Sequence, residues 1–396
     1  MPADDRTPAQ HRRRLREPRA ATASVLVAGD VCVKSGISLP GPGESLWPGL
    51  EAVVAGHDLA LVNLECPLTA RPAPIRKSGP TLSGEPDLAA RIASGGFGAV
   101  TLANNHLLDA GPAGVLDTLQ ACRSAGLRTL GAGSDLSAAE EPLVTEVGGM
   151  RVAVVACCEH EFSIAGRGRP GAAPLDPWRT PQLVRRAADS ADAVVVVVHG
   201  GNEGYTLPRP GLVAACRALV ASGAAAVVCH HAHVACPVET FRGAPIFYGT
   251  GNFVFPGARQ RGPGWLRGYL VSLELDADGV ASYSLHPTVQ QVSTPCAVPM
   301  GDDEAASFLR DLEVAAEVVA DEQRLLAAWK DFCRSERPYY LYAVLGLSRV
   351  ERKMLRLGLW PAWRRRRARI PELLGLLTCE SHREAVEQIL LEETQR

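Results

Sequence analysis

The sequence lacks an apolar run long enough to cross a membrane, and it lacks a strong excess of charge. Its densest apolar runs, such as Ala193–Val198, have the length of a strand, whereas a membrane helix needs about 18 apolar residues. Lysine and arginine total 41 against 43 aspartate and glutamate, which leaves a net charge of −2. This balance argues against a dedicated nucleic-acid binder. The Arg-rich N-terminus also lacks the apolar segment and cleavage site of a secretory signal.

Several patterns that define common sites are absent. The 11 cysteines include no C-x-x-C pair, which argues against a structural zinc site or a disulfide framework and predicts reduced, buried thiols in a cytoplasmic protein. No G-x-S-x-G or G-x-x-x-x-G-K-[ST] motif occurs, so the sequence offers neither a nucleophile elbow nor a P-loop. Two glycine pairs, at Gly131 and Gly249, lack the third glycine of a dinucleotide fingerprint and are predicted to be tight turns.

Short β-rich runs alternate with amphipathic stretches through much of the chain, which has 396 residues and is 46% hydrophobic. This alternation predicts an α/β fold with a largely buried sheet. We divide the chain into a disordered basic leader (1–23), a catalytic domain (24–298) and a C-terminal helical region (299–396). The expected strands are Val25–Ala28, Leu59–Asn63, Ala99–Leu102, Arg151–Ala156, Ala193–Val198 and Ala225–Cys229, and the expected helices between them include Ala113–Ala125, Thr180–Ala191 and Gly211–Ser222.

Polar side chains follow five of these strands. They are Asp30, then Asn63 and Glu65, then Asn104, Asn105 and His106, then His199, and finally His230, His231 and His233. Ligands of α/β sheets bind outside the carboxyl ends of the strands, so these side chains are predicted to share one edge. Imidazole, carboxylate and amide groups without a thiolate cluster favour one or two divalent ions of zinc, manganese or iron per chain. A carboxylate commonly bridges two such ions, and Asp30 and Glu65 are the candidates.

Seven segments, taken in order over residues 24–292, resemble the CapA proteins of poly-γ-glutamate capsule synthesis. They are Gly29-Asp30, Asn63–Thr69, Leu102–Gly111, Cys158–Ser163, His199–Pro210, His230–Val234 and Ile246–Phe255. That family is similar to the calcineurin-like metallophosphoesterases. The resemblance implies a four-layer α/β/β/α metallophosphatase-like sandwich, here with a C-terminal helical appendage, and a site for two metals.

The resemblance also implies roles for individual residues. Asp30 and His233 would bind the first metal, Glu65 would bridge, Asn105, His199 and His231 would bind the second metal, and His106 would protonate the leaving group. His231 and His233 are an i, i+2 pair, so both would point the same way along an extended segment and His230 would point away. Residues predicted to support ligands or contact substrate are Asn63, Lys77, Glu159, Glu161, Glu203, His230 and Asn252.

Two positions depart from the phosphoesterase pattern. Cys32 stands where that pattern has a metal-binding histidine, and Asn63-Leu64-Glu65 replaces the usual Gly-Asp of the bridging position. We expect Cys32 to be a buried structural thiol, although a metal could deprotonate it and use it as a ligand. The first metal site is therefore expected to be the weaker of the two.

The leading hypothesis is a metal-dependent hydrolase in which metal-activated water attacks a phosphoester or a γ-glutamyl amide. The alternatives are a non-catalytic assembly factor for a polymer synthase and a metal-dependent transferase. The expected partner is an anionic small molecule or polymer. The run Arg364–Arg367, beside Trp360 and Trp363, could contact a membrane surface or a synthase. Without a recognisable N-terminal anchor, we expect a cytoplasmic enzyme acting on a precursor.

Overall fold

The computed structural model describes residues 11–18, 22–41, 43–257, 261–291, 293–345, 350, 353–354, 357 and 377. Its larger sheet contains nine strands in the order β1-β16-β15-β2-β3-β4-β5, with β14 added beside β2 and β17 beside β16. These strands are β1 (His11–Arg14), β2 (Ala23–Val31), β3 (Leu59–Leu64), β4 (Ala99–Thr101), β5 (Arg128–Leu130), β14 (Asn252–Val254), β15 (Arg267–Asp276), β16 (Gly279–Gln290) and β17 (Ala297–Pro299). Strands β2 to β5 run parallel to one another.

The second sheet has six strands in the order β12-β13-β11-β10-β8-β7. They are β7 (Leu143–Val147), β8 (Met150–Cys158), β10 (Ala193–His199), β11 (Ala226–His230), β12 (Val238–Phe241) and β13 (Ala244–Phe247). Its central strands β8, β10, β11 and β13 are parallel. A two-stranded ribbon joins β6 (Ala132–Gly133) to β9 (Gly171–Ala172).

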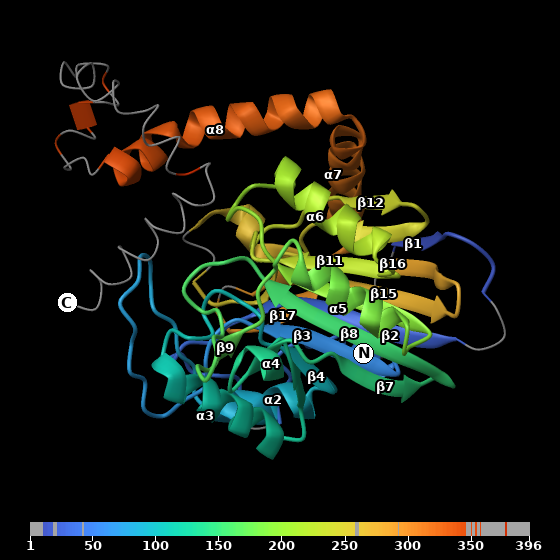
Figure 1. Ribbon diagram of the computed structural model, residues 1–396, viewed down its shortest axis with the longest axis horizontal. Helices are drawn as coiled ribbons and strands as arrows, with labels where there is room; N and C mark the ends of the chain where they lie inside the picture. The colour runs from blue at the N-terminus through green and yellow to red at the C-terminus, as the bar shows by residue number, and fades with distance from the viewer. Residues whose placement is uncertain are drawn as a thin grey trace, which may run out of the picture. The chain divides into compact units, whose positions relative to one another are not determined.

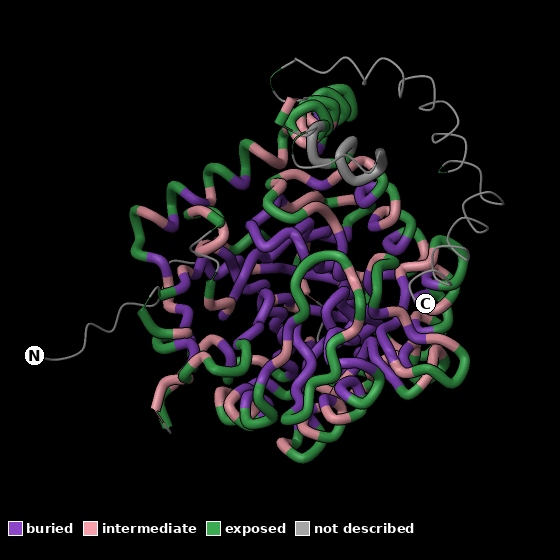
Figure 2. Tube along the Cα trace, turned by 90° about the vertical axis from the view of Figure 1, so that its left-hand side faces the viewer, coloured by how far each residue is buried: buried purple, intermediate pink, exposed green. Residues whose placement is uncertain are grey.

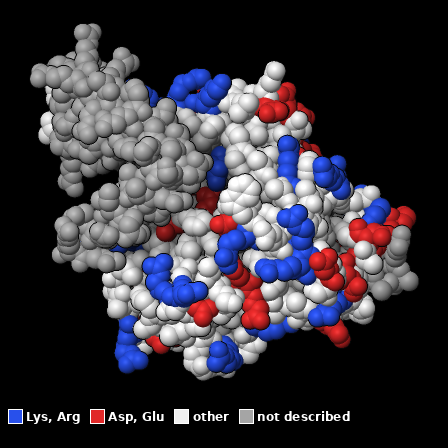
Figure 3. Space-filling view, viewed as in Figure 1, with Lys and Arg blue, Asp and Glu red and all other residues white. Residues whose placement is uncertain are grey.

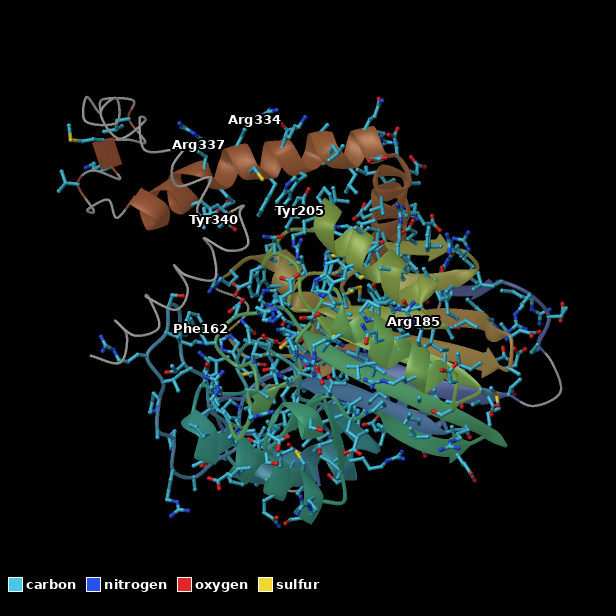
Figure 4. All side chains as sticks on the ribbon, viewed as in Figure 1. Phe162, Arg185, Tyr205, Arg334, Arg337 and Tyr340 are labelled. Carbon is cyan, nitrogen blue, oxygen red and sulfur yellow. The ribbon has the colours of Figure 1, made fainter. Side chains whose placement is uncertain are left out.

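Helices cover the outer faces of both sheets, so the predicted four-layer α/β/β/α sandwich is confirmed (Figure 1). The helices are α1 (Glu51–Ala55), α2 (Asp87–Ser94), α3 (Gly111–Ser124), α4 (Leu136–Ala139), α5 (Arg179–Ala188), α6 (Pro210–Ala221), α7 (Asp302–Ala320) and α8 (Glu322–Leu345), with the 3-10 turn η2 (Pro263–Leu266). Helices α5 and α6 pack on the second sheet, while α2 and α3 lie on the side of the larger sheet. Figure 2 shows the buried residues concentrated between these layers. The exposed side of α5 carries Arg185 (Figure 4).

The alternation of side chains along the buried strands assigns each residue of the second sheet to one of two cores. In β10, Val195 and Val197 join the core between the sheets, whereas Val194 and Val196 join the core under α5 and α6. Both faces of a central parallel strand are buried, which explains the continuous apolar run of β10. Since His199 follows Val195 and Val197 at the same two-residue spacing, it faces the space between the sheets.

The N-terminal segment differs from the expected disordered leader. Residues His11–Arg14 form β1, which pairs antiparallel with β16. The guanidinium of Arg12 donates to Glu274 Oε2 at 2.9 Å, and Arg16 forms an ion pair with the fully buried Asp276. The basic side chains therefore have acidic partners on the β15–β16 hairpin, which a composition argument alone does not reveal.

The chain divides into two compact units, Met1–Leu325 and Leu326–Arg396. This boundary lies after the one we expected at 298/299, because α7 places Phe308 and Leu312 in the core between the sheets. Within the part of the chain that the structure describes, no helix combines the length and apolar character needed to span a bilayer. The Arg-rich run Arg364–Arg367 lies outside the described residues.

His286 on β16 makes stability depend on pH. Burial, reinforced by the charge of His57, lowers the pKa of His286 to about 4, and its Nε2 lies 2.7 Å from Ser272 Oγ. Because the unfolded chain takes up this proton near pH 6.5 and the folded chain does not, stability falls as the pH drops from about 6.5 towards about 4. We expect His286→Gln to reduce the loss of unfolding free energy between pH 7 and pH 5 by about 2 kcal/mol.

Urea unfolding of both proteins at the two pH values measures this difference. His160→Gln, at an exposed histidine, is the matched control and should keep the wild-type dependence. An equal dependence in wild type and His286→Gln would contradict the assignment.

Candidate metal centre

The carboxyl ends of strands from both sheets meet at the candidate centre. Asp30 is the penultimate residue of β2 and lies opposite Asn63 of β3, and His199 ends β10 opposite His230 of β11. Strand alternation turns His199 and His230 into the space between the sheets, towards β2 and β3. These side chains do gather, but they come from the edges of two sheets that face each other and not from the single edge that we expected.

A close approach of two backbone segments brings Asp30 beside β14. A Cβ atom on Gly29 would lie 2.2 Å from the carbonyl oxygen of Gly251, so only glycine fits before Asp30. The amide N–H of Asp30 donates to that same carbonyl at 3.2 Å, and Asp30 is paired with Asn252 across β2 and β14. The motifs Gly29-Asp30 and Gly251-Asn252 are thus two halves of one local structure.

Two groups of three side chains have the geometry to hold metal ions. The first metal-binding group is Asp30, Glu65 and His233, and the second is Glu65, His199 and His231. Within each group the potential ligand atoms lie within 4.8 Å of one another. Glu65 belongs to both groups, as expected of a bridging ligand. Both of its carboxylate oxygens are buried without a hydrogen-bond partner. A buried, unpaired carboxylate is costly, and a bound cation would compensate it, so the residues present fit a divalent metal.

The amide of Asn105 completes the second group. Its Oδ1 lies 3.0 Å from His199 Nε2, and His231 Nδ1 lies 3.1 Å from the same nitrogen. His199 Nε2 is also 3.6 Å from Glu65 Oε1. Asn105 Oδ1, His231 Nδ1 and Glu65 Oε1 thus all lie within 3.6 Å of His199 Nε2.

The electrostatics of the two groups suit cation binding. Burial would raise the pKa of Asp30, but hydrogen bonds and charges from His230 and His233 hold that pKa well below its ordinary value. Burial is the main cause that lowers the pKa of His199 well below its ordinary value, and the charge of the neighbouring His231 adds to it. The lowered pKa favours the neutral ring, which is the form that binds metals. Burial, then the charge of Asp30, raises the pKa of Glu65 well above its ordinary value. A bound cation would favour the ionised form of this carboxyl.

The backbone conformation of the segment after β11 differs from the extended one that the sequence predicted. His231 and His233 have positive φ angles of 86° and 58°, so the segment is bent through left-handed conformations and is not extended as we expected. Such angles are uncommon outside glycine and cluster at functional sites. The expectation that His230 points away is also wrong, because its Nδ1 lies 3.3 Å from Asp30 Oδ1.

Aromatic and amide groups hold the ring of His233. The ring of Trp265 stacks on it at 4.7 Å between centroids, and Phe255 meets it edge-on at 4.9 Å. Its Nδ1 lies 2.9 Å from Asn252 Oδ1, while Asn252 Nδ2 donates to the carbonyls of His233 and Trp265. Asn252 therefore positions a candidate ligand, in keeping with its predicted supporting role.

His106 lies beside Asn105 in a buried cluster of charged groups. Its Nδ1 is 2.6 Å from Asp109 Oδ2, and Lys77 Nζ donates to Asp109 Oδ1 at 2.5 Å. The Lys77 side chain is only 2% exposed, so it acts inside the fold, where its ammonium contacts both Asp109 and, at 3.2 Å, His106 Nδ1. Asp109 was not among the predicted site residues, although its position three residues after His106 was the available clue.

The remaining predicted residues lie around the centre. Asn63 Nδ2 donates to Asp30 Oδ1 at 2.7 Å and lies 3.3 Å from His199 Nδ1, so it touches both groups. Glu159 accepts from Arg209 Nη2 at 2.6 Å. Glu203 pairs with Arg261 at 3.7 Å on the surface.

Cys32 is buried, and neither of the two metal-binding groups found among the described residues includes it. A hydrogen bond with Cys66 and burial raise the pKa of Cys32 well above its ordinary value, which disfavours the thiolate that a metal binds. The first group therefore offers three potential ligands and the second, with Asn105, offers four.

The chain is thus a four-layer α/β/β/α sandwich with histidine, carboxylate and amide side chains gathered at its strand ends. Residues 24–257 match the model of the bacterial capsule synthesis protein PGA_cap family. The chain belongs to that family.

Curated relatives agree with this assignment. The capsule biosynthesis protein CapA of Bacillus anthracis is 32% identical over 223 residues, which cover 54% of this chain and 53% of that protein. The PGA biosynthesis protein CapA of Bacillus subtilis is 31% identical over 226 residues, which cover 54% and 57%. The matched regions thus span little more than half the length of these two relatives. A probable polyglutamine synthesis accessory protein of Mycobacterium tuberculosis is 32% identical over 265 residues, which cover 62% and 68%.

Among solved structures, a phosphatase from Mycoplasma pneumoniae matches 68% of this chain and 95% of its own, with 13% identity and a TM-score of 0.43. A hypothetical protein of Thermus thermophilus matches 67% and 98%, with 15% identity and a TM-score of 0.42. Similarity at this level carries no conclusion about a reaction.

Proposed function

We propose that the chain is a metal-dependent hydrolase that cleaves a phosphoester or a γ-glutamyl amide. The observation that carries this proposal is Glu65, which is fully buried, has two carboxylate oxygens without a hydrogen-bond partner and is shared by both metal-binding groups. A residue arranged in this way has no evident structural purpose without a cation.

Each residue has a distinct role in this proposal. Asp30, Glu65 and His233 would hold one ion, and Glu65, Asn105, His199 and His231 the other. When bound, manganese, zinc or iron would supply Lewis-acid polarisation and a nucleophile derived from water. Asn63 and Asn252 orient ligands through the contacts described above.

His106 would protonate the leaving group. Its Nδ1 faces the carboxylate of Asp109, which leaves Nε2 as the nitrogen free to deliver a proton. Lys77 neutralises the far oxygen of Asp109 and so fixes the carboxylate in place. Phe162, labelled in Figure 4, is 40% exposed near this group, with Lys77 Nζ 5.9 Å from its ring centroid, and would contact the leaving group or the substrate body.

The substrate is proposed from the family. The names of the relatives associate them with capsule, PGA or polyglutamine synthesis, so we infer an anionic precursor or polymer of that kind. The face shown in Figure 3 carries basic and acidic groups interspersed, without a broad basic field. A cytoplasmic location and a transferase reaction with an acceptor other than water stay predictions.

A non-catalytic role in assembling a polymer synthase is the second candidate. The loss of the expected histidine at Cys32 favours it, as does the description of the Mycobacterium tuberculosis relative as an accessory protein. The buried His106–Asp109–Lys77 group argues against it, since metal binding alone needs no such arrangement beside the ligands.

Metal analysis of wild type and His231→Ala tests the proposal. We expect one to two ions per chain in wild type after loading with manganese, zinc or iron, and loss of at least one ion in the variant. Loaded wild type should hydrolyse an aryl phosphate or a γ-glutamyl anilide, and His231→Ala should be at least 100-fold slower, in keeping with the loss of a metal ligand.

The control for this experiment is His160→Gln, an exposed histidine outside the two groups, which should behave as wild type. Metal binding without turnover of either substrate would favour the assembly role. Absence of bound metal under every loading condition would contradict the hydrolase.

A further inference from the structure

In the second metal-binding group, Asn105 and His231 each have one polar atom that faces the other potential ligands and one that faces away from them. The two atoms that face away both lie near the same carboxylate. Asn105 Oδ1 and His231 Nδ1 both face His199 Nε2, at 3.0 and 3.1 Å. The other polar atoms of the same two side chains, Asn105 Nδ2 and His231 Nε2, must then point outward. Both meet Glu161, whose Oε2 accepts from Asn105 Nδ2 at 3.2 Å and whose Oε1 lies 3.9 Å from His231 Nε2.

We propose that Glu161 is a positioning residue that sets the metal affinity of this group by holding two of its ligands from outside. An amide can bind a cation only through its oxygen, and the hydrogen bond to Glu161 fixes Asn105 with its nitrogen outward and its oxygen inward. The Glu161 carboxylate is too far from His231 Nε2 for a direct hydrogen bond, at 3.9 Å, but its charge favours the tautomer with the proton on Nε2, which leaves Nδ1 as the free ligand atom. One side chain thus selects the binding atom of two ligands.

The arrangement places Glu161 outside the cluster. Its carboxylate lies on the side of Asn105 and His231 opposite to His199, and it belongs to neither of the two metal-binding groups. The Glu161 side chain is 38% exposed, so it lies at the rim of the centre. This inference rests on the proposed metal centre and requires no particular substrate.

Manganese affinity separates this role from that of a solvated surface charge. We expect Glu161→Ala to bind Mn²⁺ about 10–100-fold more weakly at one site, as is typical when an outer carboxylate is removed. Glu161→Gln keeps an acceptor for Asn105 and should lose less. The control is Glu146→Ala, which removes an exposed carboxylate from β7 and should keep wild-type affinity.

Titration of each metal-free protein with Mn²⁺ against a fluorescent chelator measures the affinities. The visible absorption of cobalt-loaded protein adds a second readout, because altered ligand orientation changes the spectrum even at saturation. Thermal unfolding of the metal-free proteins, expected to be unchanged, shows that the variants fold.

Wild-type affinity and an unchanged cobalt spectrum in Glu161→Ala would overturn the inference while leaving the hydrolase intact. Weakened affinity in Glu161→Ala, in a chain that hydrolyses no substrate, would support the inference and reject the hydrolase. A wild-type chain that binds no Mn²⁺ would overturn this inference, and a chain that binds none of manganese, zinc and iron would overturn the hydrolase as well.

Discussion

Replacing Glu65 by Gln is expected to abolish metal binding at both groups and, at the same time, to stabilise the metal-free chain. Glu65 contributes to each group, so its loss removes the shared ligand. An amide oxygen is a far weaker ligand for two cations than a carboxylate. The ion content should fall from one or two per chain to background, and hydrolysis should fall with it.

The gain in stability follows from the surroundings of Glu65. Both carboxylate oxygens are buried without a hydrogen-bond partner. Burial, together with the charge of Asp30, raises the pKa of this carboxyl well above its ordinary value. Glutamine has nearly the same shape, carries no charge, and brings an N–H that can donate to the Asp30 carboxylate. We expect the free energy of unfolding of the metal-free chain to rise by about 1–3 kcal/mol.

Urea unfolding of both proteins, with and without Mn²⁺, measures the two effects. Wild type should gain stability from the metal, about 2.7 kcal/mol at 100 times its dissociation constant, whereas Glu65→Gln should gain none. Glu146→Ala is the control for a carboxylate on the surface. A metal-free Glu65→Gln chain that is clearly less stable than wild type would contradict the idea that this residue is retained for a cation at the expense of stability.

Replacing His106 by Gln is expected to slow turnover by about 10²–10⁴-fold, the range for loss of a proton donor, without changing the metal content. His106 lies beside the ligand Asn105, but its Nδ1 is engaged by Asp109, and it belongs to neither metal-binding group. The loss should be smaller for an ester of nitrophenol than for an alkyl ester. Nitrophenolate departs readily without a proton, so it depends less on the donor.

Steady-state rates with the two esters, together with metal analysis, test this role. His160→Gln, on the neighbouring loop after β8, should keep wild-type rates with both esters. Equal losses with both esters would argue that His106 shapes the site without donating a proton. Loss of metal in His106→Gln would place it among the ligands instead.

The sequence alone determined the class of fold and the residues at its centre. Continuous apolar runs such as Ala193–Val198 are buried on both faces, so they predict strands between helices whatever their partners. The parallel direction of those strands then places the residues after them at the carboxyl edge of each sheet, which brings Asp30 close to Glu65. His199 lies at the edge of the other sheet, and only the packing of the two sheets brings it to them. Hydrophobic periodicity and polar residues at strand ends are local properties of the sequence.

The tertiary structure decided which atoms face each other. The left-handed backbone at His231 and His233, the turning of His230 towards Asp30 and the burial of Lys77 against Asp109 depend on segments far apart in the chain. So do the pairing of β1 with β16 and the two contacts of Glu161. Hydrogen-bond geometry and burial arise only when both sheets are packed together, so residue type and spacing could nominate candidate ligands but could not say which atom of each faces the others.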